Sequence, residues 1–459
     1  MTSLHHPHLS GLGRNPAAPE DILVRLAAHP AGRHGMAGRG GPLPDAVVEA
    51  LLAHGDNSVT VVRPRDRLSP AMRRRIAGHP DPAIRDAHAD FVRSMVDRDV
   101  PMDIEDLEDA YGRPRTALVG APSAPLRAAV ARAWRDRPLA VHVELLADPD
   151  PTVRASATGH GQPAVPPEWR DRCLADPATR ANVARHAPLT WDQFVPLMRS
   201  EDEETHQAVT ENPCLSSAMV ARILEMDAAG EIDDPMVRVA VAQHRHTDAA
   251  TRDRLYARVE ADRAGGSIEA DVALSWYGIE PDWLREAPLD ERLTYLDCPH
   301  SAFRRVLASC HDLPDEAWRR LDSDPELTVR RTAARRPDAP PEVLERLVRA
   351  HGEVFHIRPL LVDHPRFPRH TLRTFVDEPS PHIRYVALQD PALPVPALAQ
   401  LAADAEHFVR RGVARHPNIT QELLTRLLSD PAPEVVDDAA ANPALRPAEM
   451  YDILATHAE

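Results

Sequence analysis

Residues 409–430 read VRRGVARHPNITQELLTRLLSD, and residues 329–349 repeat the same pattern as VRRTAARRPDAPPEVLERLVR. Two further copies, which begin at Ile357 and Ile383, align with them without gaps through the first turn. A proline in the middle of the pattern recurs at steps of 28, 26, 26 and 26 residues, at Pro337, Pro365, Pro391, Pro417 and Pro443. A fixed period of this length is typical of solenoids, in which each unit buries its apolar face against its neighbours.

Each copy is predicted to form two short helices. In the first, apolar residues stand four apart, as Val409 and Val413 do, which places them on one helix face. The second helix shows paired apolar positions, as in Leu423, Leu424, Leu427 and Leu428. Neither helix can bury its apolar face alone, so the stacking of neighbouring units must bury it.

Capping residues mark the predicted helix starts. Ser69, Thr190 and Thr420 precede second helices, where a hydroxyl can accept a hydrogen bond from the first turn. Units open with Asp-Pro pairs such as Asp324–Pro325. We expect the Asp to cap the first helix and the Pro to occupy its first position.

More divergent copies can be traced towards the N-terminus, which gives about fifteen units. We therefore expect an all-α, right-handed solenoid of two-helix repeats of roughly 26 residues. In this scheme residues 1–14 form a flexible N-terminal tail and residues 15–259 the N-terminal repeats. Residues 260–300 form an irregular break, and residues 301–459 the regular C-terminal repeats.

The pattern D-P-x-x-x-V-R followed by A-x-x-P-x-x-P-x-x-x-L-x-x-L resembles the units of bacterial leucine-rich repeat variant proteins and, more broadly, HEAT repeats. This resemblance covers most of the chain and implies a fold, not a reaction. Some leucine-rich-variant proteins carry a cysteine cluster for an iron–sulfur centre ahead of the repeats. The present sequence lacks such a cluster, so no cofactor is expected.

The composition excludes several classes of site. The chain has no lysine, so all 54 Lys+Arg residues are arginine, and a Walker A motif, a kinase strand lysine and a pyridoxal Schiff base are excluded. The four cysteines are far apart and form no CxxC motif, so neither a disulfide framework nor a metal site is expected. There is no signal-peptide pattern and no run long enough to span a membrane, which favours the cytoplasm.

An acid stands six residues before an arginine in several units, at Asp148/Arg154, Asp324/Arg330, Glu378/Arg384 and Asp404/Arg410. HEAT repeats similar to these join neighbouring units through such pairs, so we expect a structural ladder of forked arginine–carboxylate contacts. An anion-binding ladder is the alternative.

A second polar series occupies the position just before the shared proline or its equivalent: His160, His186, Asn212, His244, His364, Asp390, His416 and Asn442. Asn, Asp and His tolerate the left-handed backbone that a tight helix exit needs, so a capping role is expected. A line of stacked histidines that binds metal or responds to pH is the alternative.

The arginine doublets offer a candidate binding surface. Their second members, Arg305, Arg331 and Arg411, lie away from the buried helix face and could align as a basic stripe. This stripe could bind an acidic protein segment or a nucleic-acid backbone. Alternatively, it is a solvated face whose charge is balanced by nearby acids.

The break at residues 260–300 is rich in aromatic residues. Trp276 and Tyr277 are candidate partner-binding residues, because Trp and Tyr supply rigid contact area with a polar group. The alternative is that large side chains fill a gap between misaligned helices. Trp283 matches a core position of the second helix and is expected to be buried.

Catalytic motifs are missing from the sequence, including HExxH, GxSxG, and GxGxxG after a strand. We therefore expect a non-catalytic scaffold that binds a protein or peptide along the solenoid surface. The alternative is a nucleic-acid-associated HEAT-like protein, such as one similar to a DNA glycosylase, that uses the arginine stripe. The formal net charge of -16 weighs against this alternative, because phosphate binding usually requires a basic surplus.

Overall fold

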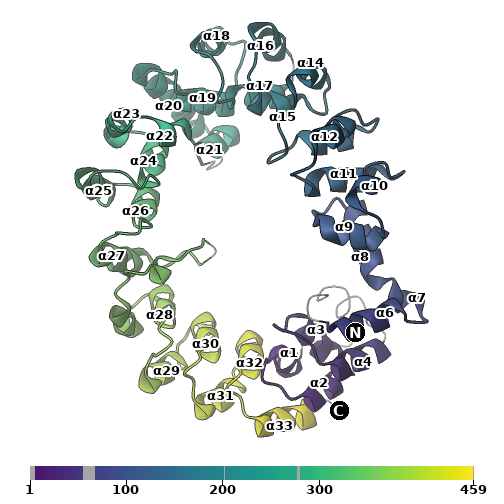
Figure 1. The fold of residues 1–459 in the computed structure, drawn as a ribbon. Helices are drawn as coiled ribbons and strands as arrows, with labels where there is room; N and C mark the ends of the chain where they lie inside the picture. Colours follow the sequence, from purple (N-terminus) through teal and green to yellow (C-terminus); the bar gives the residue numbers. More distant parts are fainter. Residues whose placement is uncertain (1–5, 55–67, 201, 276–279, 356, 458–459) are drawn as a thin grey trace. The chain divides into compact units, whose positions relative to one another are not determined.

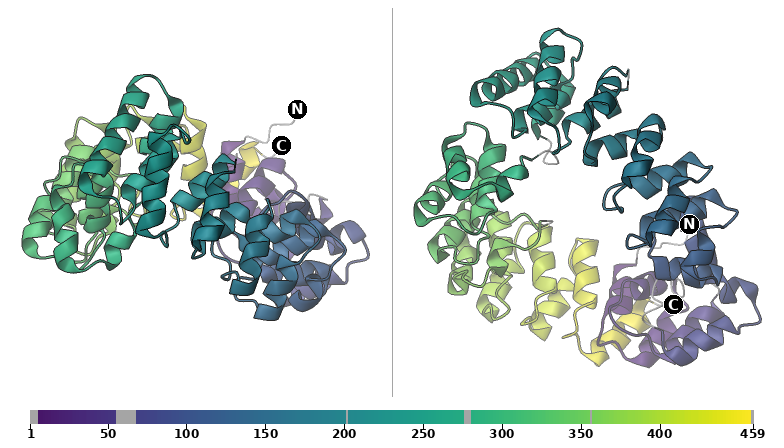
Figure 2. Two further views of the ribbon diagram at one scale, coloured as in Figure 1. Left: turned by 90° about the horizontal axis from the view of Figure 1, so that it is seen from above. Right: turned by 45° about the horizontal axis from the view of Figure 1, so that its top comes forward.

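A computed structural model describes residues 6–54, 68–200, 202–275, 280–355 and 357–457 of the chain. Within these ranges the regular secondary structure is entirely helical, and pairs of short helices follow one another along the chain (Figures 1 and 2). The prediction of an all-α solenoid of two-helix repeats is therefore confirmed. The chain divides into two compact units, residues 1–91 together with 334–459, and residues 92–333.

The first unit combines segments from both ends of the chain. Its N-terminal helices are α1 (Pro7–Arg14), α2 (Glu20–Leu26), α3 (Pro30–Ala37), α4 (Asp45–Ala53), α6 (Pro70–Ala77) and α7 (Pro82–Arg85). Its C-terminal helices are α27 (Pro341–His351), η3 (Leu361–Asp363), η4 (Arg369–Asp377), α28 (Pro381–Ala387), α29 (Val395–Leu401), α30 (His407–Ala414), α31 (Gln421–Leu427), α32 (Pro433–Ala440) and α33 (Pro447–His457).

Helix α8 (Ala87–Asp97) leads into the second unit. This unit first contains α9 (Ile104–Tyr111), α10 (Arg115–Leu118), α11 (Ala124–Ala133), α12 (Leu139–Leu146), α13 (Pro151–Thr158), α14 (Pro167–Ala175), α15 (Arg180–His186), α16 (Trp191–Met198), α17 (Glu203–Thr210) and α18 (Ser217–Ala228). It continues with α19 (Pro235–Gln243), α20 (Ala249–Ala264), α21 (Ile268–Ser275), α22 (Trp283–Glu286), α23 (Leu289–Leu293), η2 (Thr294–Asp297), α24 (Ser301–Ala308), α25 (Asp315–Leu321) and α26 (Leu327–Ala333).

The apolar pattern places the core where the sequence predicts it. Val409 and Val413 are fully buried, as are the paired leucines Leu424 and Leu427 of the second helix. The predicted caps at the start of second helices are also confirmed, since Ser69, Thr190 and Thr420 each accept a hydrogen bond from a backbone N–H of the first turn. The helical period and the capping hydroxyls are local signals, and they position both helices of a repeat.

The predicted role of the Asp-Pro pair is confirmed at Asp81–Pro82, Asp150–Pro151 and Asp234–Pro235 but is wrong at Asp324–Pro325. Asp324 and Pro325 both precede helix α26, which begins at Leu327. One carboxylate oxygen of Asp324 accepts from the backbone N–H of Glu326 at 2.8 Å, which forms a turn ahead of the helix. The same turn occurs at Asp148, where Asp150 is the true N-cap residue of α13.

The prediction of a flexible tail at residues 1–14 is wrong for the described part of that segment. Pro7–Arg14 form helix α1, in which Leu9 and Leu12 are buried. This helix packs against α3 and against α32, so the first and last parts of the chain lie side by side (Figure 1). Gly11 permits this approach, because a Cβ atom there would overlap the backbone oxygen of Asp437.

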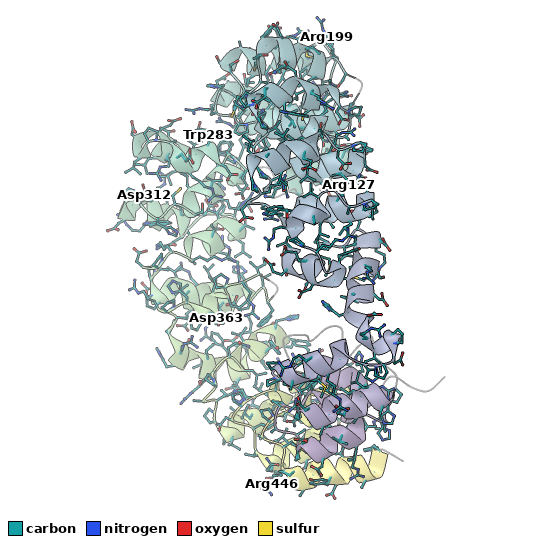
Figure 3. The ribbon with its side chains drawn as sticks, turned by 45° about the vertical axis from the view of Figure 1, so that its right-hand side comes forward. Arg127, Arg199, Trp283, Asp312, Asp363 and Arg446 are labelled. Carbon is teal, nitrogen blue, oxygen red and sulfur yellow. The ribbon has the colours of Figure 1, made fainter. Side chains whose placement is uncertain are left out.

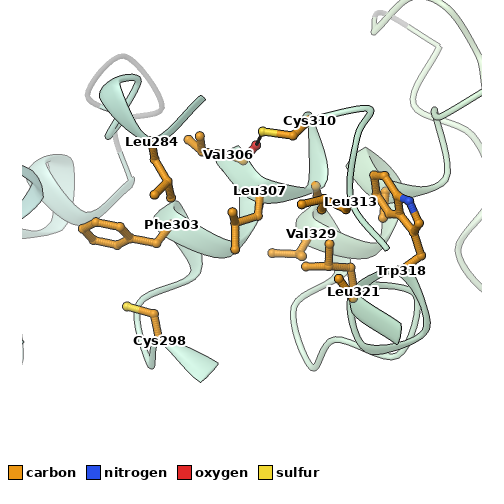
Figure 4. Packing of buried hydrophobic residues seen from close by; sticks show 13 residues of the cluster. Leu284, Cys298, Phe303, Val306, Leu307, Cys310, Leu313, Trp318, Leu321 and Val329 are labelled. Atoms are coloured by element: carbon orange, nitrogen blue, oxygen red, sulfur yellow. Dashed lines mark hydrogen bonds between the residues drawn. The ribbon is translucent and has the colours of Figure 1, made fainter. Parts of the chain in front are cut away.

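The predicted break contains an additional helix. The long helix α20 is followed by α21, which packs against both α19 and α20. Downstream, a core of buried residues surrounds Phe303 and Trp318 (Figure 4). Trp283 is only partly buried and packs against the edge of this core, where its indole N–H donates to the backbone oxygen of Gln243 at 2.9 Å. The expectation that Trp283 is buried is therefore wrong, although its side chain does pack against the core.

Among the described residues, no helix is both long enough and apolar enough to cross a membrane.

Candidate functional site

A cavity of about 430 Å³ opens where α20, α21 and α24 meet in the second unit. We call it the Arg305 groove and define it by its chemically distinctive lining residues, Tyr256, Glu260, Arg263, His300, Arg305 and Glu326. Helix α21, which belongs to the irregular stretch of the sequence, lines this cavity through Ala273, Leu274 and Ser275. One of the predicted binding residues, Arg305, therefore lies beside the predicted break.

Arg305 is held by an ion pair. Its Nε lies 2.7 Å from Oε1 of Glu280, and the other carboxylate oxygen of Glu280 lies 3.0 Å from Arg285. The side chain of Arg305 is only 15% exposed. This position makes Arg305 part of the groove wall, with its charge already balanced.

Two stacked rings form part of the groove. The rings of Tyr256 and His300 lie 3.8 Å apart with an interplanar angle of 14°. The Tyr256 hydroxyl accepts a hydrogen bond from Gln243 at 3.1 Å, and His300 Nε2 lies 2.8 Å from Asp253. Burial raises the pKa of Tyr256 to about 12 and lowers that of His300, so both rings are neutral at pH 7.

The groove carries charges of both signs. Glu260 and Arg263 of α20 are exposed, and Glu326 and Arg305 line the same cavity from other elements. Carboxylates, guanidinium groups and a neutral aromatic stack can together bind the backbone and mixed side chains of a polypeptide. Tyr256 is only 7% exposed and the His300 side chain 14%, so the stack forms a wall of the groove, and the exposed charges fix the orientation of a bound segment.

The other predicted binding residues lie elsewhere. Arg411, in the first unit, is within 2.5 Å of the buried Asp438, and Arg415 reaches the same carboxylate at 2.7 Å. Arg331 is half-buried on α26 of the second unit. Trp276 and Tyr277 lie outside the described residues, and their predicted role in partner binding stays a prediction.

Arginine–carboxylate contacts do join neighbouring repeats, as predicted, but each arginine binds a different carboxylate from the one expected. Arg127 of α11, labelled in Figure 3, donates two hydrogen bonds to the carboxylate of Asp148, at 2.6 and 2.8 Å. Arg154 donates two hydrogen bonds to the carboxylate of Asp176 in the same way, at 2.6 and 3.2 Å. The same contact joins further pairs of neighbouring repeats: Arg304 with Asp324, Arg384 with Asp404 and Arg410 with Asp430.

The acid six residues before each arginine contributes its backbone, not its carboxylate. The Nη1 of Arg154 donates to the carbonyl oxygen of Asp148 at 2.9 Å, and Arg410 and Arg330 contact the carbonyls of Asp404 and Asp324 in the same way. The predicted ion pairs between an arginine and the acid six residues before it are therefore wrong. Each Asp carboxylate is held by its own turn and by the arginine of the preceding repeat.

The polar residues before the shared proline also act differently from the prediction. Among the described residues, Asp99 alone has a left-handed backbone without being glycine, so the expected left-handed caps are wrong. The side chains of Asn212, His364, His416 and Asn442 instead bind backbone carbonyls of the preceding repeat. Asn442 donates to the carbonyl oxygen of Ala414 at 2.7 Å, and His416 Nε2 lies 2.8 Å from the carbonyl oxygen of Asp390.

The sequence did not reveal one member of this series. Asn15 is fully buried, and its side-chain amide donates to the carbonyl oxygens of Ala440 and Asn442 at 2.9 and 2.7 Å. Its own amide oxygen accepts from the N–H of Ala17 at 2.8 Å, as Asn442 does from Ala444. The signal in the sequence is Asn15–Pro16, which matches Asn442–Pro443.

Comparisons with known proteins support the repeat assignment and give little further detail. A search of curated proteins finds no match. Among solved structures, a crystal structure of an engineered protein is similar over 97% of this chain and 99% of its own, at 16% identity and a TM-score of 0.17. Residues 327–350 match the family model described as leucine rich repeat variant. The chain thus contains a leucine rich repeat variant unit, as its resemblance to that HEAT-like family implies.

Proposed function

We propose that this repeat protein is a non-catalytic scaffold that binds an extended segment of a partner protein in the Arg305 groove. The observation that carries the proposal is a cavity lined by exposed charges of both signs, with the Tyr256–His300 stack in its wall. Central aromatic contacts supply much of the binding energy at protein interfaces, and a polar rim supplies orientation. A solenoid offers such a surface between its repeats without moving its core.

The charge distribution favours a polypeptide partner over a nucleic acid. Arg305 and Arg411 are both paired with carboxylates. Nucleic-acid binding draws much of its affinity from arginines that neutralise phosphates and release the counterions condensed on them, and an arginine already paired with a carboxylate contributes less. The net charge of -16 also favours a polypeptide partner over a nucleic acid. The cytoplasmic location expected from the sequence is part of the same proposal.

The test starts from partners captured by the tagged full-length chain from its host, with nuclease present. Affinity for a purified partner is then compared between the wild type and two charge reversals in the groove, Glu260→Arg and Arg263→Glu. We expect each reversal to weaken binding at least about tenfold, since like charges would face the partner. Arg319→Glu is the matched control, because Arg319 is 72% exposed on α25 and does not line the groove.

A Trp276→Ala/Tyr277→Ala variant tests the two aromatic residues that follow α21 in the sequence, in the same assay. Equal affinity for the wild type and both groove variants would contradict the proposed binding site. Recovery of nucleic acid alone, with affinity that falls steeply as salt rises, would instead support the nucleic-acid alternative.

A further inference from the structure

Three histidines from opposite ends of the chain meet in the first unit. His6 is the N-cap residue of α1, His8 lies in the first turn of that helix, and His457 is the last residue of α33. The ring centroids of His8 and His457 are 4.3 Å apart, and those of His6 and His457 are 4.8 Å apart. One nitrogen from each ring lies within 4.8 Å of the other two.

The hydrogen bonding of His8 leaves a suitable nitrogen for a metal ion. Its Nε2 lies 2.9 Å from the backbone oxygen of Leu428. A carbonyl oxygen can only accept, so Nε2 carries the proton and Nδ1 keeps a free lone pair. A backbone carbonyl that orients a histidine in this way is the usual outer contact of a metal ligand.

The hydrogen bonding of His6 also favours a metal site. Among the described residues, its Nδ1 is buried and has no hydrogen-bond partner. A buried polar nitrogen without a partner is costly, and a bound cation would remove that cost.

We propose that His6, His8 and His457 bind one zinc ion, or a divalent ion of similar ligand preference, and so fasten helix α1 to helix α33. Three imidazoles suit zinc and leave a fourth position for water. Ligand nitrogens around tetrahedral zinc are roughly 3.3 Å apart, so the rings would approach one another by less than about 1.5 Å. The ion would bind only when the two ends are docked, and would therefore stabilise the docked state.

The site is tested by counting tightly bound ions. The full-length chain, stripped with a chelator, is titrated with zinc, and the variants His6→Gln and His457→Ala are compared with it. We expect each variant to bind one ion fewer than the wild type. His311→Ala, which removes an exposed histidine in the second unit, should bind as many ions as the wild type.

A second measurement separates this site from weak binding to surface histidines. Cobalt(II) in place of zinc should give the intense visible absorption of a four-coordinate ion in the wild type, and His6→Gln should lose it. Zinc should also raise the melting temperature of the wild type, with no increase in His457→Ala. Unchanged ion counts in both variants, or an equal loss in His311→Ala, would overturn the proposal. Circular dichroism of each metal-free variant checks that it is folded.

Discussion

The side-chain amide of Asn15 donates to the backbone oxygen of Asn442 at 2.7 Å, while Asn442 donates in the same way to the backbone oxygen of His416 at 3.4 Å. The contact that joins successive repeats near the end of the chain therefore also joins its first repeat to its last. It places a residue from the start of the chain among the best-buried polar groups of the first unit.

Replacement of Asn15 by alanine should destabilise the first unit. Two buried carbonyl oxygens would lose their donor, so we expect a loss of about 2–3 kcal/mol in the free energy of unfolding, measured with urea. Asn442→Ala should cost a similar amount. Asn418→Ala is the control, because Asn418 also donates to a carbonyl oxygen but is exposed, and its loss should cost less than about 1 kcal/mol. Equal effects for Asn15 and Asn418 would contradict this account.

Gly11→Ala should displace helix α1 from α32. The added methyl group would overlap the backbone of Asp437, and backbone cannot move aside as a flexible side chain can. We expect a loss of about 1–3 kcal/mol and faster hydrogen exchange of the amides in α1. Gly40→Ala is the matched control, since a Cβ atom there meets no atom within 4 Å. Unchanged exchange in Gly11→Ala would show that the close approach is not required.

The Arg384–Asp404 pair should contribute measurably to stability. The carboxylate is only 4% exposed and the pair is forked at 2.6 and 2.9 Å. We expect a double-mutant cycle with alanine to give a coupling of about 1.5–3 kcal/mol. The exposed pair Arg319–Glu316 should give less than about 0.5 kcal/mol. A coupling as small as that of the exposed pair would show that the ladder does not stabilise the stack.

The same pair predicts a pH effect. Hydrogen bonds from Arg384 lower the pKa of Asp404 below its ordinary value of 3.8. The folded protein therefore keeps this carboxylate charged at a pH where the unfolded chain takes up a proton. The contribution of this carboxylate to the free energy of unfolding is complete well above pH 3.8. It is lost as the pH falls through the lower pKa of the folded state. In urea unfolding at a series of pH values, Asp404→Asn should lose this part of the acid dependence.

Two buried histidines should make the second unit sensitive to milder acid. Burial, with Arg137 beside His142 and His246 beside His244, lowers the pKa of each ring to about 4. The unfolded chain takes up protons near pH 6.5 and the folded chain only near 4, so stability falls between these values. The loss should reach at most about 3 kcal/mol per histidine. His142→Gln and His244→Gln should each flatten the decline, and a variant with the wild-type pH profile would contradict the assignment.

The sequence predicted what depends on local periodicity. The four-residue spacing of Val409 and Val413 determines which helix face is buried, and the hydroxyl of Thr420 determines where a helix begins. Both features can be predicted from the sequence of one repeat, without reference to its neighbours. The all-helical fold follows directly from such signals.

Contacts between repeats could not be predicted in the same way. Arg384 pairs with an acid 20 residues ahead, in the next repeat, although an acid stands much closer on its N-terminal side. The stack of Tyr256 on His300 and the meeting of His8 with His457 depend on how helices are placed in space. Sequence spacing carries no information about such placement once regular repetition is interrupted.

The docking of α1 on α32 also bears on how the protein behaves at high concentration. If α1 left its own chain, it could make the same contacts with α32 of a second molecule, and the exchange would propagate into polymers. Attachment to the same chain gives α1 a high local concentration that intermolecular exchange must overcome. Variants that loosen this helix, such as Gly11→Ala, are therefore the ones in which domain-swapped oligomers should first appear.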